Sequence, residues 1–447
     1  MPSDIYSEIS AYHSELENHN PVFSCGFIFW LLVLSCISGT LVGYQQGIIA
    51  GSELFLKDEY EGITTQEREF FISFYALGAF AGTLVGGYMC DRWGRKGSMV
   101  ISDIFICAGL LWISFIPNMY LGFVGRIITG FGSGISSFAV PMYISEIVPD
   151  KYNKKLVAAY GCFSSAGLVG GLNLAIPFRH QWKILFEVGC APAIVQLIIV
   201  IFLPESQNYY INNGEDEKAL KVLKLGLSDA DAGRELRKLK FERKFYTSET
   251  MTEGKKWRDI FTIYWYPLAV TVGLSFFAQA IGTAAFLYYG PEIILNTHSD
   301  VEAIEEHEES AVILDNAIVV AYAVGNLASA FVIVKTGRKM MVLIALPVAF
   351  AMLSVLSYAM YESNDDAAYD SPEETEAFKH TERGVFIAAS SIYILAVSIG
   401  FSSTVWGLAS EIFPIYLLST ASSFSSSFGW AVNFVITSIF LNILDDE

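Results

Sequence analysis

Long apolar stretches alternate with short polar segments along almost the whole chain. Each stretch has about 20 residues, enough for a helix to cross roughly 30 Å of hydrocarbon. The pattern predicts an all-α integral membrane protein. We expect eleven spans, near residues 25–50, 69–89, 98–117, 121–147, 156–177, 184–203, 264–295, 311–334, 339–361, 384–412 and 416–444.

The polar segments divide by charge. Twelve of the 28 Lys and Arg residues lie between residues 204 and 260, and three short basic turns hold most of the others, whereas the loops around 302–309 and 365–376 are acidic. Because Lys/Arg bias sets membrane orientation, the polar tail 1–24 and the segment 204–262 are predicted to be cytoplasmic. The polar, acidic tail has no cleavable signal peptide, so the first span acts as its own signal.

Two similar sequence motifs lie at the ends of apolar spans, which indicates an internal repeat of one membrane unit. They are Ser-Glu-Ile-Val-Pro (145–149) and Ser-Glu-Ile-Phe-Pro (410–414), and each follows an earlier Gly-Arg-Lys turn, at 94–96 and 337–339. Six spans (25–203) precede the cytoplasmic segment and five (263–447) follow it. We therefore expect either a missing twelfth helix or a miscount in the region 384–444.

Within the cytoplasmic segment, residues 215–246 have the apolar spacing of an amphipathic helix with Lys and Arg between. Such a helix can lie on anionic lipid. We favour the alternative, a helical linker packed under the bundle.

The segment 86–96 (Gly-Gly-Tyr-Met-Cys-Asp-Arg-Trp-Gly-Arg-Lys) ends the second span. Its glycines permit close helix approach. Asp91 could face the positive N-terminal end of a neighbouring helix, and Arg92 and Arg95 could pair with carboxylates such as Glu146. Simple positive-inside anchoring is the alternative, but anchoring does not require Gly and Asp at this spacing.

Arg126 lies inside an apolar run followed by glycines at 130, 132 and 134. An Arg within a span costs at least about 2.5–3.5 kcal/mol on insertion scales, so it should face a polar interior and have a partner. Gating and a structural ion pair explain it equally well.

These motifs carry a family resemblance. Four motifs follow one another in the order found in the sugar porters of the major facilitator superfamily, which this chain resembles. They are Asp-Arg-x-Gly-Arg-Lys, Gly-Arg-x-x-x-Gly-x-Gly-x-Gly, Pro-Met-Tyr-Ile-Ser-Glu and Pro-Glu-Ser, the last of which contains Glu205. Gly-Tyr-Gln-Gln-Gly (43–47) and Trp406 resemble further signatures of that family. The resemblance implies two six-helix bundles around a central site that opens to each side in turn.

The resemblance also implies that amides and aromatic faces hold the hydroxyl groups of a sugar. The ligand candidates that remain here are Gln279, Trp406, Tyr288, Tyr289 and Asn433, although ordinary interface packing explains the two tyrosines equally well. Family amides are replaced by Ala278, Ala284, Gly161, Tyr322 and Gly429. Sugar affinity should fall, or the pocket should favour a larger or less hydroxylated solute.

Gln45, the sixth substrate-site candidate, stands where proton-coupled members of the family have an aspartate near the arginine that matches Arg126. An amide cannot take up and release a proton as a carboxylate does. We therefore expect no proton coupling through Gln45.

The salt bridges that the resemblance implies on the cytoplasmic side are also fewer than in the family. Arg338 and Glu411 remain in the second repeat, but Val334, Tyr416, Leu418, Asn153 and Asn208 replace charged residues of the family. Fewer pairs on the cytoplasmic side should shift the population toward the inward-open state.

The leading hypothesis is a facilitative carrier for a hexose, a polyol or a related small solute. We expect it to be monomeric and to lie in the plasma membrane. A proton symporter that uses another acidic group and a non-transporting or degenerate relative are the alternatives. No nucleophile–base pair, metal-ligand spacing or phosphate-binding loop stands out, so we expect no enzyme activity, no cofactor and no nucleic-acid partner.

Overall fold

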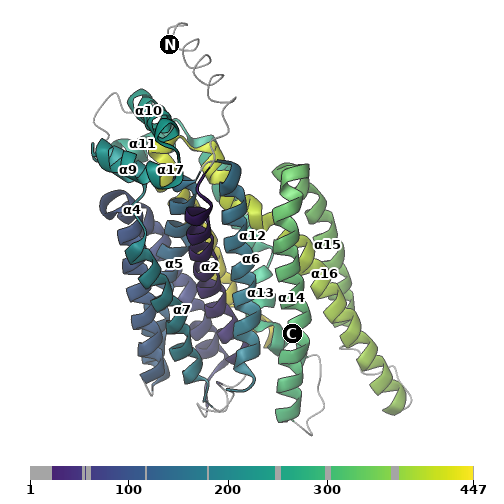
Figure 1. Cartoon of the computed structure of the whole chain (residues 1–447). Coiled ribbons are helices and arrows are strands. Elements are labelled where there is room, and N and C mark those ends of the chain that lie inside the picture. Colours follow the sequence, from purple (N-terminus) through teal and green to yellow (C-terminus); the bar gives the residue numbers. More distant parts are fainter. Residues whose placement is uncertain are drawn as a thin grey trace.

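The computed structural model describes residues 23–52, 56, 62–115, 118–148, 150–178, 181–246, 253–296, 304–363 and 372–445, and these residues form helices and turns without a strand. Five helices form the N-terminal half, on the left in Figure 1. They are α2 (Cys25–Ser52), α4 (Thr65–Phe115), α5 (Met119–Ile147), α6 (Asp150–Ala175) and α7 (Lys183–Phe202).

Helix α4 contains two of the predicted spans. Its 51 residues are interrupted by non-helical backbone at Gly94, where φ is 85° and ψ is 166°. Ten helical segments among the described residues are long and apolar enough to cross a membrane, and the two parts of α4 each have the length of one crossing. The predicted number of eleven spans is therefore confirmed.

Glycines let α5 pack directly on the backbone of α4, as their spacing predicted. A Cβ on Gly130 would lie 2.1 Å from the carbonyl oxygen of Tyr75, and one on Gly134 would lie 2.3 Å from that of Ala79. Such distances exclude any side chain larger than hydrogen. This close approach holds the first part of α4 beside the buried Arg126 of α5.

The segment predicted to be cytoplasmic forms four helices among the described residues, α8 (Gln207–Asn212), α9 (Asp216–Gly226), α10 (Asp229–Tyr246) and α11 (Glu253–Thr262). They lie above one end of the bundle (Figure 1). The prediction of one helix over 215–246 is wrong, because Ser228 accepts a hydrogen bond from the backbone N–H of Asp231 and starts a new helix. The apolar sides of α9 and α10 pack with the start of α2, as the linker interpretation expected.

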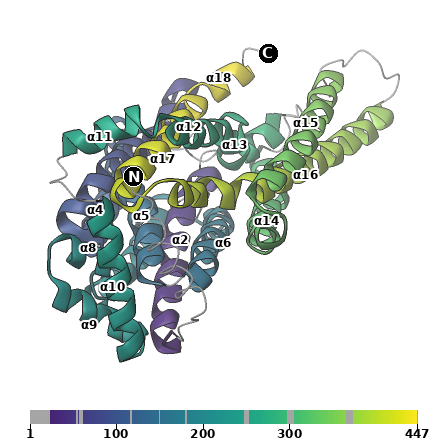
Figure 2. The same ribbon diagram turned by 90° about the horizontal axis from the view of Figure 1, so that it is seen from above.

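The C-terminal half consists of α12 (Trp265–Ala280), α13 (Thr283–Asn296), α14 (Ile304–Thr336), α15 (Arg338–Ser363), α16 (Pro372–Ile412), α17 (Ile415–Thr437) and α18 (Phe440–Asp445). The single span predicted over 264–295 is confirmed as one candidate membrane span, and within it the helix is interrupted between α12 and α13 at Gly282, where φ is 91°. Seen from above, α14, α15 and α16 lie on the side away from the linker helices (Figure 2). Helices α2, α4 and α6 of the first half contact α13, α17 and α14 of the second.

Candidate functional site

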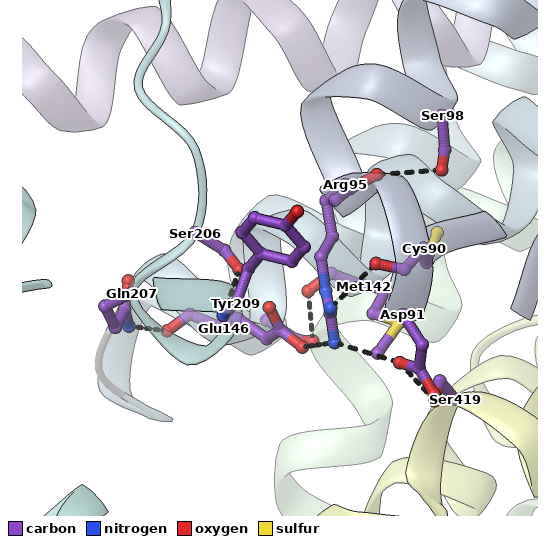
Figure 3. Close-up of polar contacts among 12 residues, drawn as sticks. Cys90, Asp91, Arg95, Ser98, Met142, Glu146, Ser206, Gln207, Tyr209 and Ser419 are labelled. Carbon is purple, nitrogen blue, oxygen red and sulfur yellow. Dashed lines mark hydrogen bonds and ion pairs between the residues drawn. The ribbon is translucent and has the colours of Figure 1, made fainter. Parts of the chain in front are cut away.

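Arg95 organises the end of the N-terminal half that is predicted to be cytoplasmic, called the cytoplasmic end below (Figure 3). Its Nη2 atom lies 2.6 Å from Oε1 of Glu146 at the end of α5, and 3.8 Å from Oδ1 of Asp91. Its Nη1 atom donates to the carbonyl oxygen of Cys90 at 3.0 Å. Arg95 and Glu146 are buried, so the pair compensates two charges that would each be costly alone. The neighbouring side chain of Arg92 is exposed instead.

Glu205 fixes the kink in α4. Its carboxylate accepts hydrogen bonds from the backbone N–H groups of Arg95, Lys96 and Ser206 at 3.0, 3.1 and 2.8 Å. The first two are free N–H groups where the helix resumes after Gly94, so Glu205 acts as an N-terminal cap supplied from another segment. Burial raises the pKa of the Glu205 carboxyl, and the backbone donors act in the opposite direction.

Asp91 connects the two halves. Ser419, near the start of α17, donates its hydroxyl to the Asp91 carboxylate at 2.8 Å, and Nζ of Lys256 in the linker helix α11 lies 2.9 Å from it. Gly87 makes this approach possible, because a Cβ there would lie 2.3 Å from Oγ of Ser423. Sequence reasoning missed Lys256 as a partner. The only signal was its position in the basic linker.

The second repeat is described only in part. Nη1 of Arg338 donates to the carbonyl oxygen of Thr404 at 3.4 Å. The side chains of Trp406 and Glu411 lie outside the described residues. Their predicted roles stay predictions.

Arg126 of α5 is the centre of a second group of buried polar residues and has an exposed fraction of 0%. Its Nε donates to the carbonyl oxygen of Phe71 at 3.1 Å, and its guanidinium carbon lies 4.8 Å from the ring centre of Tyr75. Gln45 is equally buried, and neither atom of its amide has a partner among the described residues. The polar environment predicted for Arg126 consists of aromatic faces and a carbonyl group.

The C-terminal half adds polar groups to this centre. Tyr288 of α13 is buried and lies close to Arg126 and Gln46. Asn326 of α14 donates its amide to the hydroxyl of Ser165 in α6, which joins the halves. Asn326 was missed, although an amide inside the apolar span 311–334 was a usable signal.

Two predicted ligands lie together and one lies apart. Nδ2 of Asn433 in α17 donates to Oε1 of Gln279 in α12 at 3.2 Å. Tyr289 instead donates its hydroxyl to the carbonyl oxygen of Thr437 at 2.5 Å and stacks on Phe440 with ring centres 5.5 Å apart. These contacts favour packing as the role of Tyr289.

The outer end of the same interface carries charges that sequence reasoning did not select. Nη1 of Arg68 in α4 lies 3.4 Å from Oε1 of Glu292 in α13, and both side chains are buried. The backbone N–H of Asn442 donates to Oε1 of Glu69 at 3.1 Å. Because Asp91 also bonds to Ser419, the two halves contact each other at both ends of the interface.

The family model described as "Sugar (and other) transporter" matches residues 31–447. The chain belongs to the sugar transporter family. This family member is 28% identical to the probable inositol transporter 2 of Arabidopsis thaliana, over 79% of this chain and only 61% of that protein's length. It is 27% identical to the myo-inositol transporter 2 of Schizosaccharomyces pombe, over 93% of this chain and 74% of the relative.

A third relative of this sugar transporter family member is the galactose-proton symporter of Escherichia coli strain K12, 26% identical over 93% of this chain and 85% of that one. Among solved structures, the proton:xylose symporter XylE bound to 6-bromo-6-deoxy-D-glucose matches with a TM-score of 0.76 and 22% identity, over 94% of this chain and 89% of that chain. The fold is therefore that of the major facilitator superfamily. Family and fold are those of transporters.

Proposed function

We propose that the protein is a membrane carrier that moves a hexose, a polyol or a related polyhydroxylated solute by alternating access. The observation that carries the proposal is a pair of neutral hydrogen-bonded contacts: Gln279 with Asn433 inside the C-terminal half, and Asn326 with Ser165 across the interface between the halves. Amides offer donors and acceptors together, which suits sugar hydroxyls. The named substrates of the relatives, inositol and galactose, agree with this class.

Facilitated diffusion is the proposed mode of transport. Position 45, where the family resemblance implies a proton-coupling acid, holds the buried amide Gln45, so this position supplies no group that exchanges a proton. The proposal also places the chain as a monomer in the plasma membrane. The basic linker and the start of α2, which pack together, would then lie in the cytoplasm.

The test is uptake of labelled hexoses and polyols in cells that lack their own hexose carriers. Saturable uptake is expected. Gln279→Ala should weaken affinity about two- to tenfold, since one hydrogen bond contributes roughly 0.5–1.5 kcal/mol. Gln66→Ala, at an exposed position at the outer end of α4, is the matched control and should leave affinity unchanged. A panel without any uptake, by protein shown to be at the cell surface, would support the non-transporting alternative.

One observation favours a second candidate, a proton symporter that uses an acid other than residue 45. Asp315 of α14 has an exposed fraction of 0%, and neither carboxyl oxygen has a hydrogen-bond partner among the described residues. It lies against α13, where a Cβ on Gly290 would be 2.0 Å from its Oδ1. A charge there is costly, so a bound proton is the natural compensation. The test is whether adding sugar acidifies the interior of cells that contain the protein. Acidification with the wild-type protein that is lost with Asp315→Asn would establish this candidate.

A further inference from the structure

We propose that the central site recognises a monovalent carboxylate on its substrate through the guanidinium group of Arg126, so that the preferred solutes are sugar acids such as hexuronates or aldonates. This rests on the proposed carrier function and narrows its substrate class. The feature that carries it is a buried cation that the protein leaves only partly compensated.

Arg126 is fully buried, yet its Nη1 and Nη2 atoms have no acceptor among the described residues. Its neighbours with electrostatic influence are Tyr75 and Tyr288, and no carboxylate pairs with it within the described part of the chain. Aromatic faces and one carbonyl oxygen satisfy only part of its bonding capacity. These two nitrogens belong to the planar guanidinium group, which can donate two parallel hydrogen bonds to the two oxygens of one carboxylate.

The surroundings favour a hydroxylated carboxylate over a simple anion. Tyr288 of the C-terminal half brings a buried hydroxyl close to Arg126, and the amide of Gln46 lies beside that hydroxyl. These neutral groups can bond to hydroxyls of the same solute. Because Tyr288 and Arg126 come from different halves, one ligand would bridge the interface that rearranges in alternating access.

Charge balance selects a monoanion. One guanidinium carries a single positive charge, so one carboxylate leaves the buried complex neutral. A phosphate ester carries about −1.5 to −2 at neutral pH and would leave excess negative charge in the membrane interior. Sugar phosphates should therefore bind more weakly than sugar acids.

The test compares glucuronate with glucuronamide, its neutral isostere, by competition with labelled solute and by thermal stabilisation of the purified protein. Wild-type protein should prefer glucuronate by roughly tenfold to a hundredfold, the range expected for hydrogen bonds to a charged group. Arg126→Gln should bring the ratio close to one. Arg92→Gln, at the exposed arginine, should keep the wild-type ratio.

The outcomes separate this inference from the carrier function. Saturable uptake of hexose or inositol, with an equal response to glucuronate and glucuronamide, would overturn the inference and leave the function standing. A preference for glucuronate that survives in folded Arg126→Gln protein would also overturn it. If that variant does not fold, the wild-type ratio between the two isosteres decides. A wild-type protein that binds and transports none of these solutes contradicts both proposals.

Discussion

The two ends of the N-terminal half, where α4 contacts the C-terminal half, are built differently. At the cytoplasmic end, most bonds stay within the N-terminal half and its linker, as in Arg95 with Glu146, and Asp91 with Ser419 crosses to the other half. At the outer end, Arg68 with Glu292 and Asn442 with Glu69 both cross between halves.

This difference separates two physical roles. Bonds within one half are present in every state of the carrier, so losing them lowers the free energy of unfolding. Bonds between halves exist only in some states, so losing them shifts the population among conformations. The cytoplasmic cluster should therefore respond mainly in stability, and the outer pairs mainly in conformation.

The largest effect on stability is expected from Arg95→Ala. The change leaves Glu146 buried without its cation, which costs about 3–5 kcal/mol in comparable pairs. Unfolding in mixed micelles by a detergent titration measures it. Arg92→Ala is the control and should change stability little, because that side chain is exposed. Equal losses in the two variants would contradict the described network.

Gly94→Ala should have the next largest effect. A left-handed conformation costs an L-residue about 1–2 kcal/mol, and the added Cβ would lie 2.1 Å from Oε2 of Glu205. Gly97→Ala is the matched control, because a Cβ there meets only the Cβ of Trp93 at 3.5 Å. The same unfolding titration compares them. A tolerated Gly94→Ala would mean that Glu205 does not cap the resumed helix.

Arg68→Ala tests the outer end. It removes a charged contact between halves, and such bonds contribute roughly 1.5–3 kcal/mol, so the population should shift at least tenfold toward the outward-open state. Electron-spin distances between labels at Gln66 and Ile439, in a cysteine-free background, report the separation of α4 and α17.

Glu67→Ala is the control for that experiment. Glu67 bonds to Thr64 within the N-terminal half, so its loss should leave the distance distribution unchanged. An equal shift of the distance distribution in Arg68→Ala and Glu67→Ala would contradict the distinction between bonds within one half and bonds between the halves.

The smallest effect is expected from Lys256→Ala. Its partly exposed pair with Asp91 should contribute no more than about 1 kcal/mol. Because α11 packs on α12 and α17 of the C-terminal half, this pair connects the two halves. Its loss should therefore move the carrier toward the inward-open state and speed labelling of the buried Cys90 by a thiol reagent, mapped by peptide mass spectrometry. Lys221→Ala, at an exposed linker position, should not change that rate.

Apolar periodicity and charge placement were enough to predict the spans, the linker and the doubled unit. The motif residues Asp91, Arg95 and Glu146 were also recognisable, because a charge at the end of an apolar span has few environments open to it. Two interruptions were not predicted, at Gly282 and at Ser228. Both occur where apolar spacing continues unbroken while the backbone changes direction.

The amino-acid sequence by itself determined which segments enter the membrane and which charges must find compensation there, since transfer to hydrocarbon is a local property of each segment. Only the tertiary structure decided the partners. Lys256 meets Asp91, Glu292 meets Arg68 and Asn326 meets Ser165 across distances of more than 150 residues. Such pairings depend on how helices from the two halves pack together, and the spacing of residues within one helix does not encode that packing.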